Sequence, residues 1–138
     1  MKSGTGPIPL ISILIVEDEE QTRELLANTL SRKFLDVAIH TTGNGRTGLE
    51  LFRKLTPEIV ITDINMPEMG GFQLVFKIRS LKPDTKLIVL TGCAGEETMK
   101  DSVAKEFEID HFILKPVVLN ELFAAVEHCI GGIVQHQT

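Results

Sequence analysis

The sequence lacks tryptophan and tyrosine and contains only two cysteines, Cys93 and Cys129. Two isolated thiols supply neither a disulfide framework nor a zinc ligand set, so we interpret both as reduced thiols. No apolar run is long enough to span a bilayer, and the first residues lack the apolar segment and cleavage site of a secretory signal. The composition therefore predicts a cytoplasmic protein with no membrane contact.

An excess of basic residues is also absent. Lys and Arg number 14 against 19 Asp and Glu, which gives a net charge of −5 at pH 7. This charge argues against direct binding to nucleic acid or to an anionic membrane, and it leaves a basic partner protein open. The 138 residues, 43% of them hydrophobic, suit one domain with a real core. We expect a flexible lead-in over 1–9, a domain over 10–131 and a tail over 132–138, because Gly131 and Gly132 are predicted to end the last helix.

Short apolar runs alternate with helical patterns along the chain. The predicted strands cover 11–16, 36–41, 58–62, 85–91 and 111–114, and the second is weak enough to suit an edge. The predicted helices cover 19–34, 43–55, 71–81, 96–107 and 119–130. Strands separated by helices predict right-handed crossovers and an α/β fold with a parallel sheet covered on both faces. The ligand site of such a sheet lies beyond the carboxyl ends of its strands.

The residues at those carboxyl ends carry the chemistry. Glu17 and Asp18 follow the first strand, Asp63 ends the third, Thr91 ends the fourth and Lys115 follows the fifth. Parallel strands bring these ends to one edge of the sheet, so three acids, one hydroxyl and one ammonium are predicted to converge there.

Three neighbouring carboxylates repel one another unless a cation lies between them. Mg²⁺ (or Mn²⁺) prefers oxygen ligands, and Glu17, Asp18 and Asp63 fit that role, with the backbone carbonyl of Asn65 as a further ligand. No sulfur or imidazole ligand accompanies them in the sequence pattern, which disfavours zinc or copper at this edge.

The position of Lys115 has two interpretations. The ammonium neutralises Asp63 as a structural pair, or it binds phosphoryl oxygens that the metal leaves free while the Thr91 hydroxyl donates to another. In the second case Asp63 is a nucleophile that forms an acyl phosphate. Taken alone, Asp63 is more simply a turn acid.

The residues after Asp63 suit a sharp exit from the strand. Pro67 fixes its φ angle, and Gly70 or Gly71 permits positive φ before the next helix. This geometry keeps the loop backbone near the predicted metal.

Four features in order resemble the response-regulator receiver domains of two-component signalling, over about residues 10–130. They are the Glu17-Asp18 pair, the D-x-x-M-P-x-M-x-G run from Asp63 to Gly71, Thr91, and the Lys115-Pro116 pair. The resemblance implies a flavodoxin-like three-layer sandwich, with a five-stranded parallel sheet of order 2-1-3-4-5 and five helices.

The resemblance also implies a function and roles. Asp63 is the expected phosphoacceptor, and Thr91 and Lys115 are the expected phosphate-sensing pair. Phe112 is the expected switch aromatic, with a core aromatic as the alternative. The peptide before Pro116 is often cis in the family. Expected partners are a histidine kinase or histidine phosphotransfer protein as donor, and a downstream protein or output domain contacted through helix four, strand five and helix five. A phosphorylation-dependent dimer stays open. No enzyme activity beyond slow self-dephosphorylation is expected.

The sequence departs from the family pattern at three places, one of which is a slightly longer segment between Thr91 and Lys115. The acidic pair is Glu-Asp where Asp-Asp is commoner, and Phe107-Glu108-Ile109 replaces the common Ala-Gly-Ala before the fifth strand. Loss of that glycine removes an easy left-handed helix stop. Cys93, near the expected pocket mouth, either tunes the lifetime of the phosphate or is inert, and inert is favoured. The four histidines are scattered and are predicted to form no metal site.

Two alternative functions belong to other classes. A receiver-like interaction module working without phosphorylation is disfavoured by the intact set of acids, hydroxyl and lysine. A phosphatase of the haloacid dehalogenase type needs a second aspartate as general acid two residues after the nucleophile, where Asn65 stands.

Overall fold

The computed structural model describes residues 11–64, 66, 69, 71–92 and 106–137, and within them the chain forms five strands and four helices. The strands are β1 (Ile11–Val16), β2 (Val37–Thr42), β3 (Ile59–Asp63), β4 (Lys86–Thr91) and β5 (His111–Leu114). The helices are α1 (Glu20–Lys33), α2 (Gly45–Leu55), α3 (Gly71–Leu81) and α5 (Leu119–Gln137). The helix predicted over 96–107 lies outside the described residues, apart from 106 and 107.

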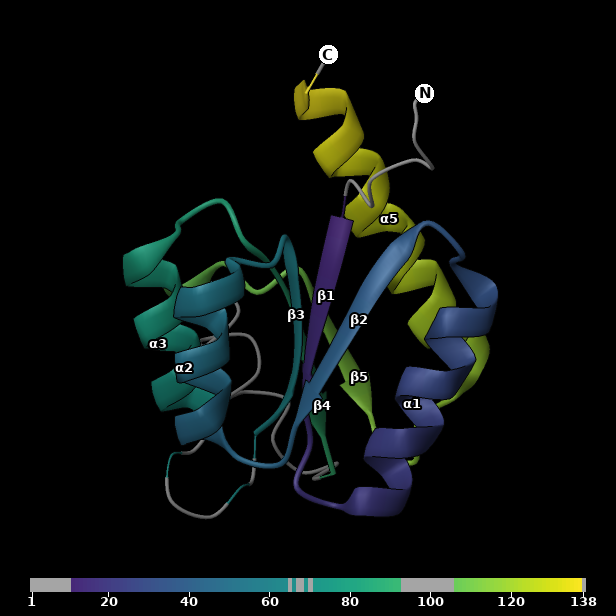
Figure 1. Cartoon of the computed structure of the whole chain (residues 1–138), viewed down its shortest axis with the longest axis horizontal. Helices are drawn as coiled ribbons and strands as arrows, with labels where there is room; N and C mark the ends of the chain where they lie inside the picture. The colour runs from purple at the N-terminus through teal and green to yellow at the C-terminus, as the bar shows by residue number, and fades with distance from the viewer. Residues whose placement is uncertain (1–10, 65, 67–68, 70, 93–105, 138) are drawn as a thin grey trace.

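Every pair of neighbouring strands is parallel, and the order across the sheet is β2-β1-β3-β4-β5. Helices α2 and α3 cover one face of this sheet, and α1 and α5 cover the other (Figure 1). The predicted α/β architecture and strand order are confirmed, and β2 is an edge strand as its weaker pattern suggested.

The central strands are apolar on both faces because each face packs against helices. In β1, Ile13 and Ile15 contact the cluster under α1 and α5, whereas Leu14 and Val16 contact the cluster under α2 and α3. All four side chains are fully buried. Burial of such a side chain stabilises the fold by about 1.5–3 kcal/mol, so the strand ends that carry the polar residues are firmly held.

The predicted end of the last helix is wrong. Helix α5 continues through Gly131 and Gly132 to Gln137. Ile130 and Ile133, on either side of the two glycines, pack against the cluster under α1 and α5. Tertiary packing therefore outweighs the helix propensity that each glycine costs, about 1 kcal/mol relative to alanine. The division of the chain at residue 131 stays a prediction.

Arg79 of α3 holds the segment that precedes β5. Its guanidinium donates to the backbone oxygens of Phe107 (3.0 Å) and Glu108 (2.8 Å), and also to those of Pro83 and Thr85 before β4. Glu108 has φ 54°, in the left-handed region. The family pattern has glycine at this position, and glutamate adopts the left-handed conformation less readily than glycine. The hydrogen bonds from Arg79 hold the main chain in this turn.

Substitutions of Glu108 should measure how much its left-handed backbone conformation lowers the free energy of unfolding. A left-handed conformation costs a non-glycine residue about 1 kcal/mol, so Glu108→Gly should raise the free energy of unfolding by about that amount. The Glu108 side chain is exposed, so Glu108→Ala, which keeps the strain, should leave stability nearly unchanged. Urea unfolding of the three proteins measures both values; a destabilised glycine variant would show that the turn is not strained.

Candidate functional site

Three backbone hydrogen bonds extend the strand pairings one residue past the strands and position the candidate site. The amide of Glu17 donates to β2 at 3.1 Å, and the amides of Ile64 and Lys115 donate to β4 at 3.1 Å and 2.7 Å. The main chain is therefore held by the sheet at the points where the polar side chains leave it. Side chains anchored in this way need little reorganisation to act together.

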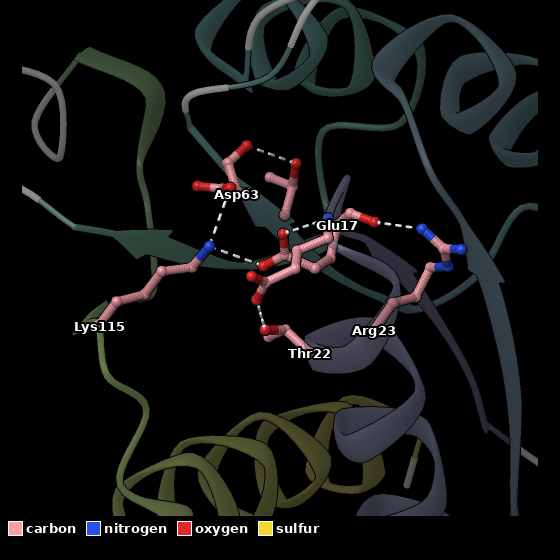
Figure 2. A network of polar contacts seen from close by, with 7 residues as sticks. Glu17, Thr22, Arg23, Asp63 and Lys115 are labelled. Carbon is pink, nitrogen blue, oxygen red and sulfur yellow. Dashed lines mark hydrogen bonds and ion pairs between the residues drawn. The ribbon is translucent and has the colours of Figure 1, made fainter.

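The predicted convergence at the carboxyl edge is observed. Lys115 Nζ lies 2.7 Å from Glu17 Oε1 and 3.0 Å from Asp63 Oδ2, so one ammonium joins residues from β1, β3 and β5 (Figure 2). Carboxylate oxygens of Glu17, Asp18 and Asp63 all lie within 4.8 Å of one another. We call these four side chains the acidic-lysine cluster.

Burial makes the charges of the acidic-lysine cluster interdependent. Glu17 is 0% exposed and Asp63 is 4% exposed, whereas Asp18 is open to solvent. Burial raises the pKa of Glu17 above its ordinary value, although Lys115 pulls it down. Burial alone would lower the pKa of Lys115, but the hydrogen bonds and charges of Glu17 and Asp63 outweigh it and hold that pKa above its ordinary value. The ammonium therefore stays charged.

Residues of α1 support Glu17 from the other side. The amide of Glu19 donates to Glu17 Oε2 at 3.0 Å, and Arg23 Nη1 donates to the backbone oxygen of Glu17 at 2.9 Å. Figure 2 shows the Arg23 side chain reaching back to the Glu17 main chain. Arg23 was not among the predicted site residues, because nothing in the sequence distinguishes a surface arginine one turn into a helix before the fold is known.

The donor set fits a divalent cation of the magnesium type. Three carboxylates and one ammonium leave the cluster with a formal charge of −2 when all are ionised. All three ligand groups are oxygen donors, which Mg²⁺ prefers, and a dication would offset the cost of the buried Glu17 charge. Asn65, the predicted source of a further carbonyl ligand, lies outside the described residues.

The loop after Asp63 packs against the start of α2. A Cβ placed on Gly45, the first residue of α2, would lie 2.4 Å from the backbone oxygen of Met69. The two backbones approach so closely that no side chain fits between them. Of the predicted loop residues, Gly71 begins α3, and Pro67 and Gly70 lie outside the described residues.

Three further predicted positions lie in β4, in β5 and just after β5. Thr91 is the last residue of β4 and is fully buried. Phe112 in β5 is half-buried and packs against the cluster under α2 and α3. The peptide between Lys115 and Pro116 is cis, as the resemblance implies. Cys93 lies outside the described residues.

Comparison with known proteins identifies the family. Residues 13–127 match the response regulator receiver domain family. Over 104 residues the chain is 36% identical to the chemotaxis protein CheY of Thermotoga maritima, and the match covers 75% of this chain and 84% of CheY. A receiver domain structure from Clostridium thermocellum superposes with a TM-score of 0.83 at 25% identity, covering 91% of this chain and 98% of that one. The chain belongs to the response-regulator receiver family of two-component signalling.

The chain covers only part of some relatives. It is 34% identical over 119 residues to the regulatory protein AtoC of Escherichia coli, and the match spans 86% of this chain but 25% of AtoC. Receiver domains are phosphoacceptor switches that bind Mg²⁺ at an acidic pocket and interact with histidine kinases and output domains. Among the described residues, no helix combines the length and apolar character needed to cross a membrane.

Removing the ammonium should expose the repulsion that it neutralises. In the presence of a chelator, Lys115→Ala should lower the free energy of unfolding by about 2 kcal/mol, a value reduced from that of a fully buried pair because Lys115 is partly exposed. Mg²⁺ should then raise the melting temperature of the variant more than that of the wild type. Calorimetry with and without Mg²⁺ measures both effects. Lys54→Ala, at an exposed site on α2, is the control; equal stability of both variants in chelator would contradict the assigned role.

A methyl group at Gly45 should displace the loop that follows Asp63. Gly45→Ala places a Cβ against the Met69 carbonyl, so the free energy of unfolding should fall by about 1–3 kcal/mol. Gly131→Ala is the matched control, because a Cβ there meets nothing within 4 Å and the helix gains up to about 1 kcal/mol. Urea unfolding should therefore give shifts of opposite sign. Unchanged or increased stability of Gly45→Ala would mean that the close approach at Gly45 does not constrain the loop.

Proposed function

We propose that this receiver domain accepts a phosphoryl group on Asp63 in a Mg²⁺-dependent reaction, from a phosphohistidine of a histidine kinase or histidine phosphotransfer protein. The observation that carries the proposal is the position of Lys115 Nζ, within 3.0 Å of Asp63 and bonded also to the buried Glu17. A nucleophilic carboxylate beside a fixed ammonium is an arrangement suited to phosphoryl transfer.

The side chains have distinct roles in this proposal. An Asp63 oxygen forms the new bond to phosphorus while the bond from phosphorus to the donor imidazole breaks, and the imidazole leaves with that electron pair. Glu17, Asp18, Asp63 and the Asn65 carbonyl would hold Mg²⁺, which would supply positive charge to the phosphoryl oxygens. Lys115 then exchanges a carboxylate oxygen for a phosphoryl oxygen, and the Thr91 hydroxyl donates to another.

The same contacts couple phosphorylation to a surface. Lys115 follows β5 directly, so a change of partner at its ammonium acts on the strand that carries Phe112. Leu114 is 43% exposed and Val118 is 53% exposed beside it, which gives a partner apolar contact area. The proposed output is a changed face of helix four, β5 and α5 that controls a downstream protein or output domain. The phosphoryl group favours one of two states, as a switch requires.

Asp63→Asn tests the acceptor. The wild type, given Mg²⁺ and a small phosphodonor, should gain the mass of one phosphoryl group, and hydroxylamine should remove it because an acyl phosphate is cleaved by that nucleophile. The asparagine variant should gain none. Asp36→Asn, at an exposed acid between α1 and β2, should behave like the wild type.

Two results would reject the proposal. A phosphoryl group retained by the Asp63→Asn protein would place the acceptor elsewhere. A wild type that gains no mass would favour an interaction module that works without phosphorylation.

A further inference from the structure

Two of the four histidines, predicted to be scattered, lie side by side in the fold. His111 begins β5 and His128 lies on α5, and His111 Nε2 is 3.1 Å from His128 Nδ1. The rings are nearly perpendicular, at 86°, with centroids 5.1 Å apart. The proposed phosphoryl chemistry uses neither residue.

The spacing of the two nitrogens suits one shared metal ion. Zinc binds imidazole nitrogen at about 2.0–2.1 Å. When the nitrogen–zinc–nitrogen angle lies between its octahedral and tetrahedral values, the two ligand nitrogens are about 2.9–3.3 Å apart. The observed 3.1 Å falls inside this interval. The ligands come from a strand and a helix, whose backbones are held by the sheet and the core.

We propose that His111 and His128 form a binding site for a divalent transition-metal ion of the zinc or nickel class, which links β5 to α5. Water completes the coordination, since both side chains reach solvent. Imidazole ligands select such metals over Mg²⁺, which prefers oxygen. The acidic-lysine cluster and the histidine pair therefore differ in the metal that each binds.

The hydrogen bond between the two rings decides which nitrogens carry hydrogen in the absence of metal. When both imidazoles are neutral, each carries one hydrogen, and one facing nitrogen donates to the other. When that hydrogen moves to the far nitrogen of its own ring, both lone pairs become available, and no net proton has to leave the pair.

Two further groups that are able to bind a metal, Asp110 and Cys129, lie beside His128. A cavity of about 280 Å³ beside His128 is lined also by Lys86, Asp110 and Cys129. Asp110 Oδ2 accepts the Leu87 amide at 2.8 Å and is held by the main chain. The Cys129 side chain is 2% exposed and packs in the cluster under α1 and α5, whereas the His128 side chain is open to solvent.

The histidine pair is separated from the phosphorylation chemistry. His111 precedes Lys115 by four residues, a distance of about 13 Å along an extended strand, and lies at the opposite end of β5. Loss of the acidic-lysine cluster leaves the histidine ligands in place, so the two proposals fail independently.

Zinc titration of the Cys93→Ser protein tests the site, because the remaining thiol, Cys129, is buried. Millimolar Mg²⁺ is kept present to occupy oxygen sites, and no polyhistidine tag is used. Micromolar Zn²⁺ should raise the melting temperature by binding the native state. The same addition should shift the imidazole NMR resonances of His111 and His128.

Substitutions of the ligands decide the outcome. His128→Gln and His111→Gln should each lower zinc affinity at least about tenfold and remove the melting-temperature shift. His40→Gln, on the far edge strand β2, should leave both unchanged. The proposal is overturned if zinc leaves the two imidazole resonances unmoved, since the pair is then a hydrogen bond only. It is also overturned if His128→Gln binds zinc as tightly as the wild type.

Discussion

The ion pairs of Lys115 with Glu17 and Asp63 are the interaction on which the functional edge of this protein depends. Three carboxylates lie within 4.8 Å of one another, and one of them, Glu17, is fully buried. Such an arrangement is unfavourable without positive charge among the acids. Lys115 supplies part of it, and the remaining formal charge of −2 favours a divalent cation at this edge of the sheet.

The sheet makes this arrangement possible because its strands are apolar on both faces. Residues such as Ile15 and Val16 anchor β1 between two helical layers, and the main chain of Glu17 is bonded to β2 directly afterwards. Rigid strands thus present polar side chains on loops that start from fixed points. A site at the end of a strand therefore combines a rigid backbone with side chains that are able to change their ionic and hydrogen-bonding partners.

The segment before β5 shows how one departure from the family pattern is accommodated. Glu108 adopts the left-handed conformation that glycine would favour, and Arg79 contributes hydrogen bonds to the main chain on both sides of that turn. The same guanidinium bonds to carbonyls before β4. Arg79 thereby joins the starts of the two strands that carry Thr91 and Lys115 at their other ends.

The order of residues alone was enough for the parallel sheet and for the gathering of Glu17, Asp18, Asp63 and Lys115 at one edge. Apolar runs that alternate with amphipathic helices are compatible with few topologies, and parallel strands end on the same side of a sheet. The strand order itself came from the family resemblance. The extent of α5 was misjudged, because the local effect of Gly131 and Gly132 is smaller than the packing of Ile133, which no local pattern reports.

Contacts between distant residues were decided by the tertiary structure. Lys115 and Asp63 are 52 positions apart, and His111 and His128 are 17 apart. The distance between such side chains depends on how helices pack on the sheet and on side-chain rotamers, and neither is encoded in hydrophobic periodicity. The roles of Arg23 and Arg79 were hidden for the same reason, since both bind backbone oxygens, which every residue carries.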